Sequence, residues 1–479
     1  MLKPLALAAA VAACVSAGAA HAAVATPMSS IGWSRLWTQS AADGAAEIVD
    51  VDALTQTLWV TNPDRIDVLS LGTGSLIDSI DLSAFGSINS VAIHNGLAAV
   101  AVAAGTPTDA GTVRFFDTAT RAADGFVSVG ALPDMVTFTP DGSRVLVANE
   151  GEPAGGVDPA GSVSIIDVAT RSVATAGFAG VPQLNGVRSA ALADLEPEYI
   201  AVAPGGTLAF VSVQEANAIA MLDLQSNSFT QIVGLGTKDF SLPGNGIDAN
   251  DKDGVIALAP VAARGLYQPD AIASYAANGQ TYVVSANEGD ARADESDEAR
   301  ARDIGVSGAL ERLTISTLDS TPADPVAFGA RSFSIWDADG NQVFDSGNQL
   351  EMEAIARGIY DEGRSDNKGV EPEGVSLLEI AGRTLAFIGL ERTTDSAIAI
   401  YDITDPANAS FIDMIVGAGD VAPEGLKAFA LGGRYYLAVS NEVSATTSLY
   451  ALAPVPEPES WALMLAGLGL IGTLARRRR

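Results

Sequence analysis

The chain has 479 residues, of which 48% are hydrophobic, and it contains 48 glycines and 22 prolines. This composition fits a large core that is interrupted by many turns. The formal net charge of −31 excludes nucleic acid as a partner, because nucleic-acid binding needs a basic face. A soluble surface protein, or one that collects cations, is compatible with such a charge.

Residues 1–22 have the features of a secretory signal peptide, with an early Lys3, an apolar run and a small-x-small ending. We predict cleavage after Ala22. A lipoprotein signal is the alternative, because the segment 11–14 matches a lipobox that ends on Cys14. If cleavage follows Ala22, the mature protein has no cysteine, and disulfides and thiol catalysis are both excluded.

A repeated sequence frame follows this segment. Each copy has a short apolar strand, a turn with Gly or Asn, a second apolar strand, a polar loop and a strand that ends in an aspartate, as in SVSIIDV and AIAIYDI. Such units are typical of propeller blades rather than of a sandwich. We therefore predict an all-β, seven-bladed β-propeller that forms a single domain over residues 31–453, with copies that start at Ala45, Ile88, Ala131, Leu195, Tyr267, Val370 and Val421.

The ring needs a closing strand, because the seventh copy supplies only three clear strands. We predict that the N-terminal segment 31–40 is the outer strand of the last blade, since an open ring would expose a long edge. The one helix candidate is the segment 293–313. Residues 336–347 predict a hairpin that turns at Asp339-Gly340. Residues 248–254 resemble an EF-hand loop but also fit a turn-rich connection.

Five copies carry a Pro-Asp or Pro-Glu start and a second acid 16 to 18 residues later. First strands line the channel of a propeller and second strands return to the same mouth, so both acids of a copy should meet on one rim. Carboxylates are calcium ligands, and we predict a Ca²⁺ site there. The candidate metal ligands, in pairs, are Asp134 and Glu150, Glu198 and Glu215, Asp270 and Glu288, Glu373 and Glu391, and Glu424 and Glu442.

Two points about the rim stay open. Glu47 fits the first-strand position of the first copy, whereas the second copy has only Asn89 and Ser90 there. As an alternative to metal binding, each acid would accept backbone N–H groups of the neighbouring blade and so hold the blades together.

Residues 455–479 predict a sorting signal. The apolar stretch 461–475 is about 22 Å long as a helix, which is short of the ~30 Å hydrocarbon core. The arginines behind it would stay cytoplasmic. The tail resembles the PEP-CTERM signal that an exosortase processes, which implies transient anchoring in the inner membrane by the hydrophobic helix, export, and an extracellular or outer-surface location. A plain membrane anchor is the alternative. The motif residues are Pro456, Glu457, Pro458, Arg476, Arg477, Arg478 and Arg479.

The repeats themselves resemble a known family. The segments "LPDMVTFTPDGSRVLVANEGEP", "GNGIDANDKDG", "FSIWDADGNQVFDSG" and "EPEGVSLLEIAGRTLAFIGLER" are similar to the choice-of-anchor I family, which is related to mesenchyme-specific cell-surface glycoproteins. The repeat unit also resembles the YVTN-type propeller repeat. The resemblance implies a secreted propeller with a variable C-terminal anchor. We therefore expect a binding protein of the cell surface or extracellular matrix, with exopolysaccharide, mineral or a surface protein as its ligand.

The remaining chemistry is limited. His94 is the one histidine of the mature chain, and Gly-x-Ser-x-Gly, HExxH, CxxC and phosphate-loop motifs are absent from the sequence. The alternative function is a calcium-dependent phosphoesterase, phytase-like or alkaline-phosphatase-like, since β-propeller phytases carry similar Pro-Glu-Gly strand starts. Metal-bound water would attack phosphate there. A hydrolase also needs cations to hold phosphate, and four lie close in sequence to the rim acids: Arg264, Lys368, Arg392 and Lys427.

Overall fold

The computed structural model describes residues 30–42, 44–188, 191–292 and 297–454. The predicted signal peptide, with Cys14 and the cleavage position at Ala22, lies outside these residues. The predicted sorting tail from residue 455 onward, including Pro456 to Pro458 and Arg476 to Arg479, lies outside them as well.

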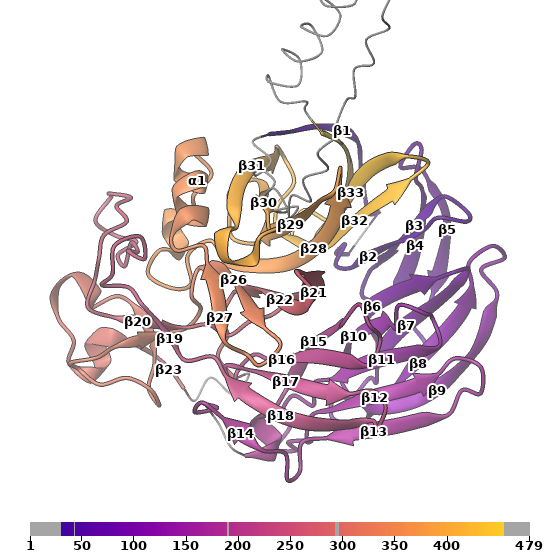
Figure 1. Cartoon of the computed structure of the whole chain (residues 1–479), viewed down its shortest axis with the longest axis horizontal. Helices are drawn as coiled ribbons and strands as arrows, with labels where there is room; N and C mark the ends of the chain where they lie inside the picture. Colours follow the sequence, from indigo (N-terminus) through magenta and orange to yellow (C-terminus); the bar gives the residue numbers. More distant parts are fainter. Residues whose placement is uncertain (1–29, 43, 189–190, 293–296, 455–479) are drawn as a thin grey trace, which may run out of the picture.

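Seven sheets of four or five strands follow one another along the described part of the chain (Figure 1). We number them as blades 1 to 7. Blades 1 to 3 consist of β2 (Val49–Asp52), β3 (Thr57–Thr61), β4 (Arg65–Ser70) and β5 (Leu76–Asp81); β6 (Ser87–His94), β7 (Leu97–Ala103), β8 (Ala110–Asp117) and β9 (Ala123–Ala131); and β10 (Pro133–Phe138), β11 (Arg144–Asn149), β12 (Ser162–Asp167) and β13 (Val173–Gly177).

Blades 4 to 6 continue the same antiparallel order. Blade 4 gains a fifth strand, β14 (Gln183–Leu184), parallel to β18. The other strands are β15 (Pro197–Val202), β16 (Leu208–Val213), β17 (Ala218–Asp223) and β18 (Ser228–Gly234); β21 (Ile272–Ala277), β22 (Gln280–Asn287), β26 (Ser332–Asp337) and β27 (Gln342–Asp345); and β28 (Pro372–Ile380), β29 (Arg383–Leu390), β30 (Ser396–Asp402) and β31 (Ser410–Gly417).

Blade 7 joins the two ends of the described chain. It contains β32 (Pro423–Leu431), β33 (Arg434–Asn441), β34 (Thr446–Pro454) and, as its outer strand, β1 (Ile31–Ser40). β1 runs antiparallel to β34, from Ile31 opposite Pro454 to Ser40 opposite Thr446. The predicted closure of the propeller by the N-terminal strand is therefore confirmed.

The first strands form a closed ring, because each contacts the next in the order β2, β6, β10, β15, β21, β28, β32 and back to β2. The core lies between neighbouring blades. Inner strands are covered on both faces, so they consist of almost continuous small and β-branched residues, as in β7 with its sequence LAAVAVA. One apolar cluster joins blades 7 and 1 and includes Leu58, Leu449 and the partly buried Trp37.

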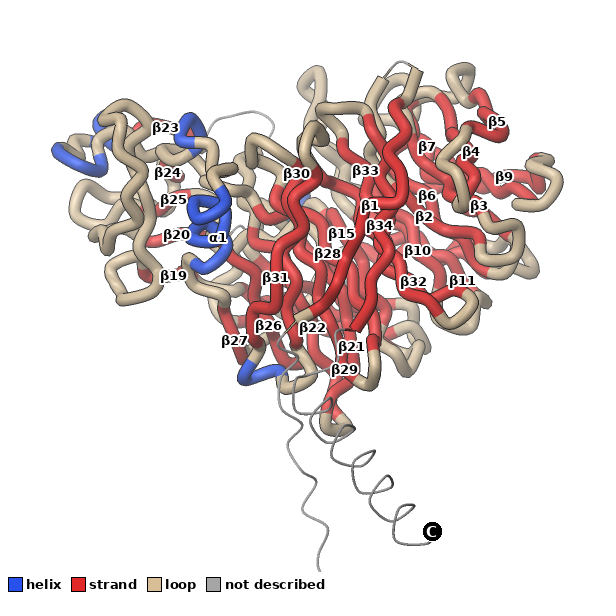
Figure 2. Tube along the Cα trace, turned by 90° about the horizontal axis from the view of Figure 1, so that it is seen from above, coloured by secondary structure: helices blue, strands red, loops and turns tan. Residues whose placement is uncertain are grey.

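A separate lobe lies at one end of the molecule (Figure 2). It is formed by the connection between blades 4 and 5 and by an insertion within blade 5. It contains β19 (Thr237–Asp239), β20 (Arg264–Leu266), β23 (Glu298–Arg300), β24 (Thr314–Ser316) and β25 (Val326–Ala327), near α1 (Gln349–Arg357). Short 3₁₀ turns span η1 (Leu192–Asp194), η2 (Ala301–Ile304), η3 (Gly308–Leu310), η4 (Glu362–Arg364) and η5 (Pro406–Asn408).

The helix predicted over 293–313 is wrong for the described residues of that segment. Those residues form β23 and two 3₁₀ turns, because Gly305 ends η2 with a positive φ angle of 96°, and Gly308, with a φ angle of 80°, interrupts a right-handed helix at the start of η3. Arg300 and Arg312 instead pair with Asp366. The α-helix of the described chain, α1, lies elsewhere and was not predicted from the sequence.

Two smaller predictions can be checked here. The hairpin at Asp339-Gly340 is confirmed, because it connects the paired strands β26 and β27. In the segment 248–254, Asp248 accepts backbone N–H groups and Asp251 pairs with Arg312 and Lys252, which matches the turn-rich connection.

Candidate metal centre

Proline and a local bulge place the acid at the start of the first strand in four blades. Pro133 pairs with Asn149, and the register then shifts before Val136. The same shift follows Pro197, Pro372 and Pro423 in blades 4, 6 and 7. The acid directly after the proline lies within this bulge. Because bulges redirect side chains, the repeated Pro-acid start gives each of these blades the same local geometry.

The residue before the proline has an unusual backbone. Leu132, Gln268, Glu371 and Ala422 have φ angles of 45°, 43°, 47° and 61°, which non-glycine residues before proline rarely adopt. In three blades the carbonyl of this residue accepts the backbone N–H of the second acid of the pair. The N···O distances are 2.9 Å for Glu150, 2.9 Å for Glu391 and 2.8 Å for Glu442. Local strain and this hydrogen bond thus hold the two acids of a blade side by side.

The predicted acids gather at one mouth of the channel, and each of them is buried or half-buried. A cavity of about 370 Å³ at this mouth is lined by Glu47, Asn89, Asp134, Glu150, Glu373, Glu424 and Glu442, with Leu132. A smaller cavity of about 60 Å³ shares Asp134 and Glu424 with it and is also lined by Asp270 and Tyr199. The position of Glu47 and Asn89 agrees with the alignment of the repeats.

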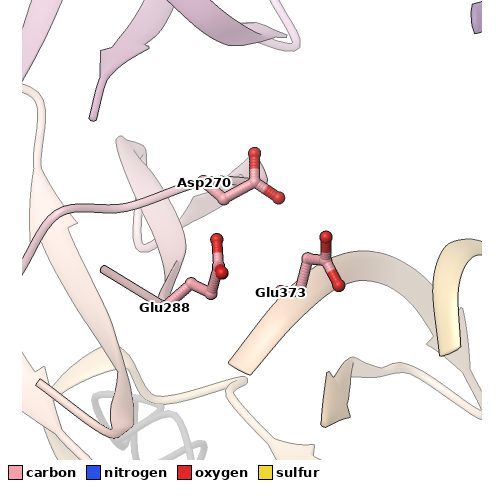
Figure 3. Close-up of side chains that lie close together, drawn as sticks. All are labelled: Asp270, Glu288 and Glu373. Carbon is pink, nitrogen blue, oxygen red and sulfur yellow. The ribbon is translucent and has the colours of Figure 1, made fainter. Parts of the chain in front are cut away.

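Three of the predicted ligands are close enough to share an ion. Asp270 and Glu288 flank the first hairpin of blade 5, and Glu373 follows the first proline of blade 6. One carboxylate oxygen of each lies within 4.8 Å of the others. Figure 3 shows these side chains approaching one another from the two blades. Oxygens bound to one calcium lie 2.3–2.6 Å from it, so they are separated by at most about 5 Å.

A second trio lies beside the first and shares Glu288. It consists of Glu288, Glu371 and Glu391, again with one oxygen of each within 4.8 Å. Glu371 was not among the predicted ligands. Its signal in the sequence was the pattern Glu-Pro-Glu at 371–373, in which acids stand on both sides of the proline. The same pattern at 196–198 adds Glu196, a buried acid, to Glu198 of blade 4.

Burial and mutual repulsion raise the pKa values of these carboxyl groups. Burial first, and then Glu442 and Asp134, raise the pKa of Glu47 to about 7. The pKa of Asp134 rises to about 6, and that of Glu391 to about 8, again mainly because of burial. The same causes raise the pKa well above the ordinary value for Glu150, Glu198, Glu215, Asp270, Glu373 and Glu424.

The clustered charge therefore needs protons or cations. Two carboxylates 4.8 Å apart repel each other by about 3.5 kcal/mol at an effective dielectric constant of 20. Some oxygens also lack hydrogen-bond donors among the described residues: Oε2 of Glu215 and Oε2 of Glu373 are buried with no hydrogen-bond partner. A divalent cation held by Asp270, Glu288 and Glu373 would neutralise charge there and would also satisfy the Oε2 atom of Glu373.

Two of the four cations that are close in sequence to the rim acids lie at the rim. Lys368 Nζ is 2.8 Å from Glu288 Oε1, and Arg392 Nη2 is 2.7 Å from Glu391 Oε1. Burial lowers the pKa of Lys368, because it opposes the charged form. The carboxylates of Glu288, Glu371 and Asp290 favour the charged form and together raise the pKa of Lys368 above its ordinary value. Arg264 and Lys427, which are close to rim acids in sequence, pair with other carboxylates. Arg264 pairs with Asp324 in the inserted lobe, and Lys427 pairs with Asp50 beside a separate cavity of the channel.

Contacts between blades at Glu288 come from side chains. Gln214, which directly follows β16 of blade 4, donates to Glu288 Oε2 at 2.9 Å, and Lys368, which precedes blade 6, donates to Oε1. Glu288 thus connects blades 4, 5 and 6. The alternative to metal binding was that each acid would accept backbone N–H groups of the neighbouring blade. Glu288 does hold neighbouring blades together, but its donors are the side chains of Gln214 and Lys368.

The fold and this mouth define a closed β-propeller with an acidic channel rim. The sequence model of the choice-of-anchor I domain matches residues 47–406, and the chain belongs to this family. The PEP-CTERM protein-sorting motif matches residues 454–479. That signal indicates recognition by an exosortase, export across the inner membrane and processing to a cell-surface or extracellular location. Both resemblances read from the sequence are confirmed. The family is one of choice-of-anchor domains and is not an enzyme family.

Two solved structures are similar to this chain at low sequence identity. Hydrazine synthase of Kuenenia stuttgartiensis is 11% identical, with a TM-score of 0.51 over 86% of this chain and 96% of its own. The Cps50 (Swd1) β-propeller domain of Myceliophteria thermophila is 8% identical, with a TM-score of 0.47 over 87% and 98%. At such identity the first likeness shows the fold alone. The curated proteins include no match to this chain.

The described residues contain no helix that is long and apolar enough to cross a membrane. The stretch 461–475, for which we predicted a membrane helix, lies outside them.

Proposed function

We propose that this protein is a binding module of the cell surface or extracellular matrix that holds calcium at the acidic mouth of its propeller. The observation that carries the proposal is the trio of Asp270, Glu288 and Glu373, whose carboxylate oxygens lie within 4.8 Å of one another. Oxygen-only ligands at this spacing suit Ca²⁺, which accepts six to eight oxygens and tolerates irregular geometry.

The rest of the mouth supports the same proposal. Glu424, Glu442 and Glu47 line the adjoining cavity of about 370 Å³, which has room for water and for an oxygen-bearing ligand beside the ion. A bound calcium with open positions could bridge the protein to carboxylates or hydroxyls of an exopolysaccharide, to mineral, or to an acidic surface protein. Export through the PEP-CTERM signal places the protein where such ligands occur.

Calcium-dependent phosphoester hydrolysis is the second candidate, and no specific observation favours it. A phosphoesterase needs cations that are available to phosphate. Lys368 and Arg392 pair with Glu288, Glu371 and Glu391, and the acids that line the mouth would repel a phosphate anion.

Calorimetric titration with calcium tests the proposal. Protein that has been dialysed against a chelator should bind calcium, and Glu373→Gln should weaken that binding. Hydrolysis of phytate or nitrophenyl phosphate by the calcium-loaded protein would instead support the phosphoesterase. The absence of calcium binding in the titration would overturn the proposed metal site.

A further inference from the structure

The second trio, Glu288, Glu371 and Glu391, has the spacing of a metal site but already contains a protein cation. Lys368 Nζ lies 2.8 Å from Glu288 Oε1 and 3.2 Å from Glu371 Oε2. Its side chain is only 13% exposed. An ammonium group at these distances occupies the place between two carboxylates that a divalent ion would take.

The surroundings of Glu371 show that this place is built into the fold. Glu371 is 1% exposed on its side chain, and its Oε1 accepts a hydrogen bond from Arg364 Nε at 2.7 Å. Its Oε2 is 3.2 Å from Lys368 Nζ and 3.9 Å from Arg392 Nε. This oxygen is buried and accepts no hydrogen bond from the described residues. The strained backbone of Glu371, with φ of 47°, holds this carboxylate beside Glu391.

The two trios differ in what neutralises them. Beyond the shared Glu288, Asp270 and Glu373 have no ion pair with a lysine or arginine among the described residues, whereas Glu371 and Glu391 have Lys368, Arg364 and Arg392 around them. A divalent ion placed in the second trio would lie next to a fixed positive charge, which it would have to displace.

We propose that Lys368 is a built-in cation that replaces a second divalent ion, and that it thereby limits the rim to the ion shared by Asp270, Glu288 and Glu373. For that one ion the inference rests on the proposed calcium-binding function. The exclusion of metal from the second trio stands on the position of Lys368 alone. The same ammonium group holds Glu288 in the orientation that the first trio uses, because Gln214 and Lys368 bind its two oxygens.

The test is the number of calcium ions bound per full chain, measured by equilibrium dialysis with metal analysis. Lys368→Gln should bind one ion more than the parent protein, since its amide is neutral and supplies a further oxygen ligand. Adding Glu371→Gln to that variant should remove the extra ion. Lys427→Gln is the matched control, because it also frees a carboxylate, Asp50, which belongs to neither trio and lines a separate cavity. Its calcium count should equal that of the parent.

The outcomes separate this inference from the proposed function. A parent that binds no calcium, with one ion in Lys368→Gln, would support the role of Lys368 and overturn the parent metal site. Equal counts in the parent and Lys368→Gln, including zero in both, would overturn the inference. If Lys368→Gln folds only in calcium, the ion replaces the ammonium group as proposed, whereas misfolding that calcium does not relieve would contradict it.

Discussion

The backbone N–H of Glu391 donates to the carbonyl of Glu371 at 2.9 Å, although the two residues are separated by an entire hairpin. The acceptor residue precedes a proline and has a positive φ angle. Blades 3 and 7 repeat this bond with Leu132 and Ala422 as acceptors. Because the same strained turn brings a second acid against the first, the repeat concentrates carboxylates at one mouth of the channel.

Calcium should stabilise the protein through the trio at this mouth. At a concentration a hundred times the dissociation constant, a ligand of the native state adds about 2.7 kcal/mol to the free energy of unfolding. The melting temperature should therefore rise in calcium and fall in chelator, and Glu373→Gln should reduce the difference. Glu379→Gln is the matched control, since Glu379 is an exposed acid farther along β28. A melting temperature that is the same with calcium, with chelator and with neither would contradict the metal site.

The stability of the calcium-free protein should decrease as the pH rises. Glu47, Asp134 and Glu391 have folded-state pKa values of about 7, 6 and 8, above their ordinary values of 4.5, 3.8 and 4.5. Between pH 4.5 and 8 the native state therefore holds more protons than the unfolded state, so the free energy of unfolding falls as pH increases.

Melting curves in chelator across this pH range provide the measurement. Calcium should flatten the profile, because its affinity increases as the carboxyl groups lose protons. If the protein in chelator is more stable at pH 8 than at pH 5, interactions within the protein stabilise the ionised form of the buried carboxylates, and the prediction is wrong.

The N-terminal strand should contribute to stability through Trp37. Its indole Nε1 donates to the carbonyl of Leu71 at 3.0 Å, and its ring packs on Gly74, where a Cβ atom would lie 2.6 Å from it. Trp37→Ala should lower the free energy of unfolding by about 2–3 kcal/mol, below the usual range for fully buried tryptophan because this ring is partly exposed. Chemical denaturation measures the change.

Leu36→Ala serves as the control for that experiment. Leu36 is 50% exposed in the same strand, and exposed substitutions usually change stability by less than about 0.5 kcal/mol. Equal effects of the two substitutions would mean that β1 does not act as a specific closure between blades 7 and 1.

Much of the fold could be predicted from the sequence, because each repeat contains strands, turns and acids in the same order. The position of β1 followed from the missing fourth strand of blade 7, and the rim acids followed from the antiparallel hairpin. The two trios did not follow from the sequence, since they depend on contacts between blades 5 and 6. Lys368 and Glu371 lie in the connection that enters blade 6, where no repeat pattern predicts side-chain direction. α1 was missed because it is short, with Leu350 and Ala354 buried and Met352 exposed.

Deletion of Pro456 to Arg479 should release the protein without harming its fold. Among the described residues, β34 is the last strand and ends at Pro454, where it pairs with Ile31 of β1, and its pairing with β33 begins at Leu452. The truncated protein should therefore melt at the same temperature as the processed full-length protein.

In the producing cells the truncated protein should appear in the medium without exosortase, whereas the intact chain should stay with the inner membrane when exosortase is absent. Fractionation with and without exosortase measures the distribution. A truncated protein that is degraded or that melts at a lower temperature would show that the tail contributes to the folded structure.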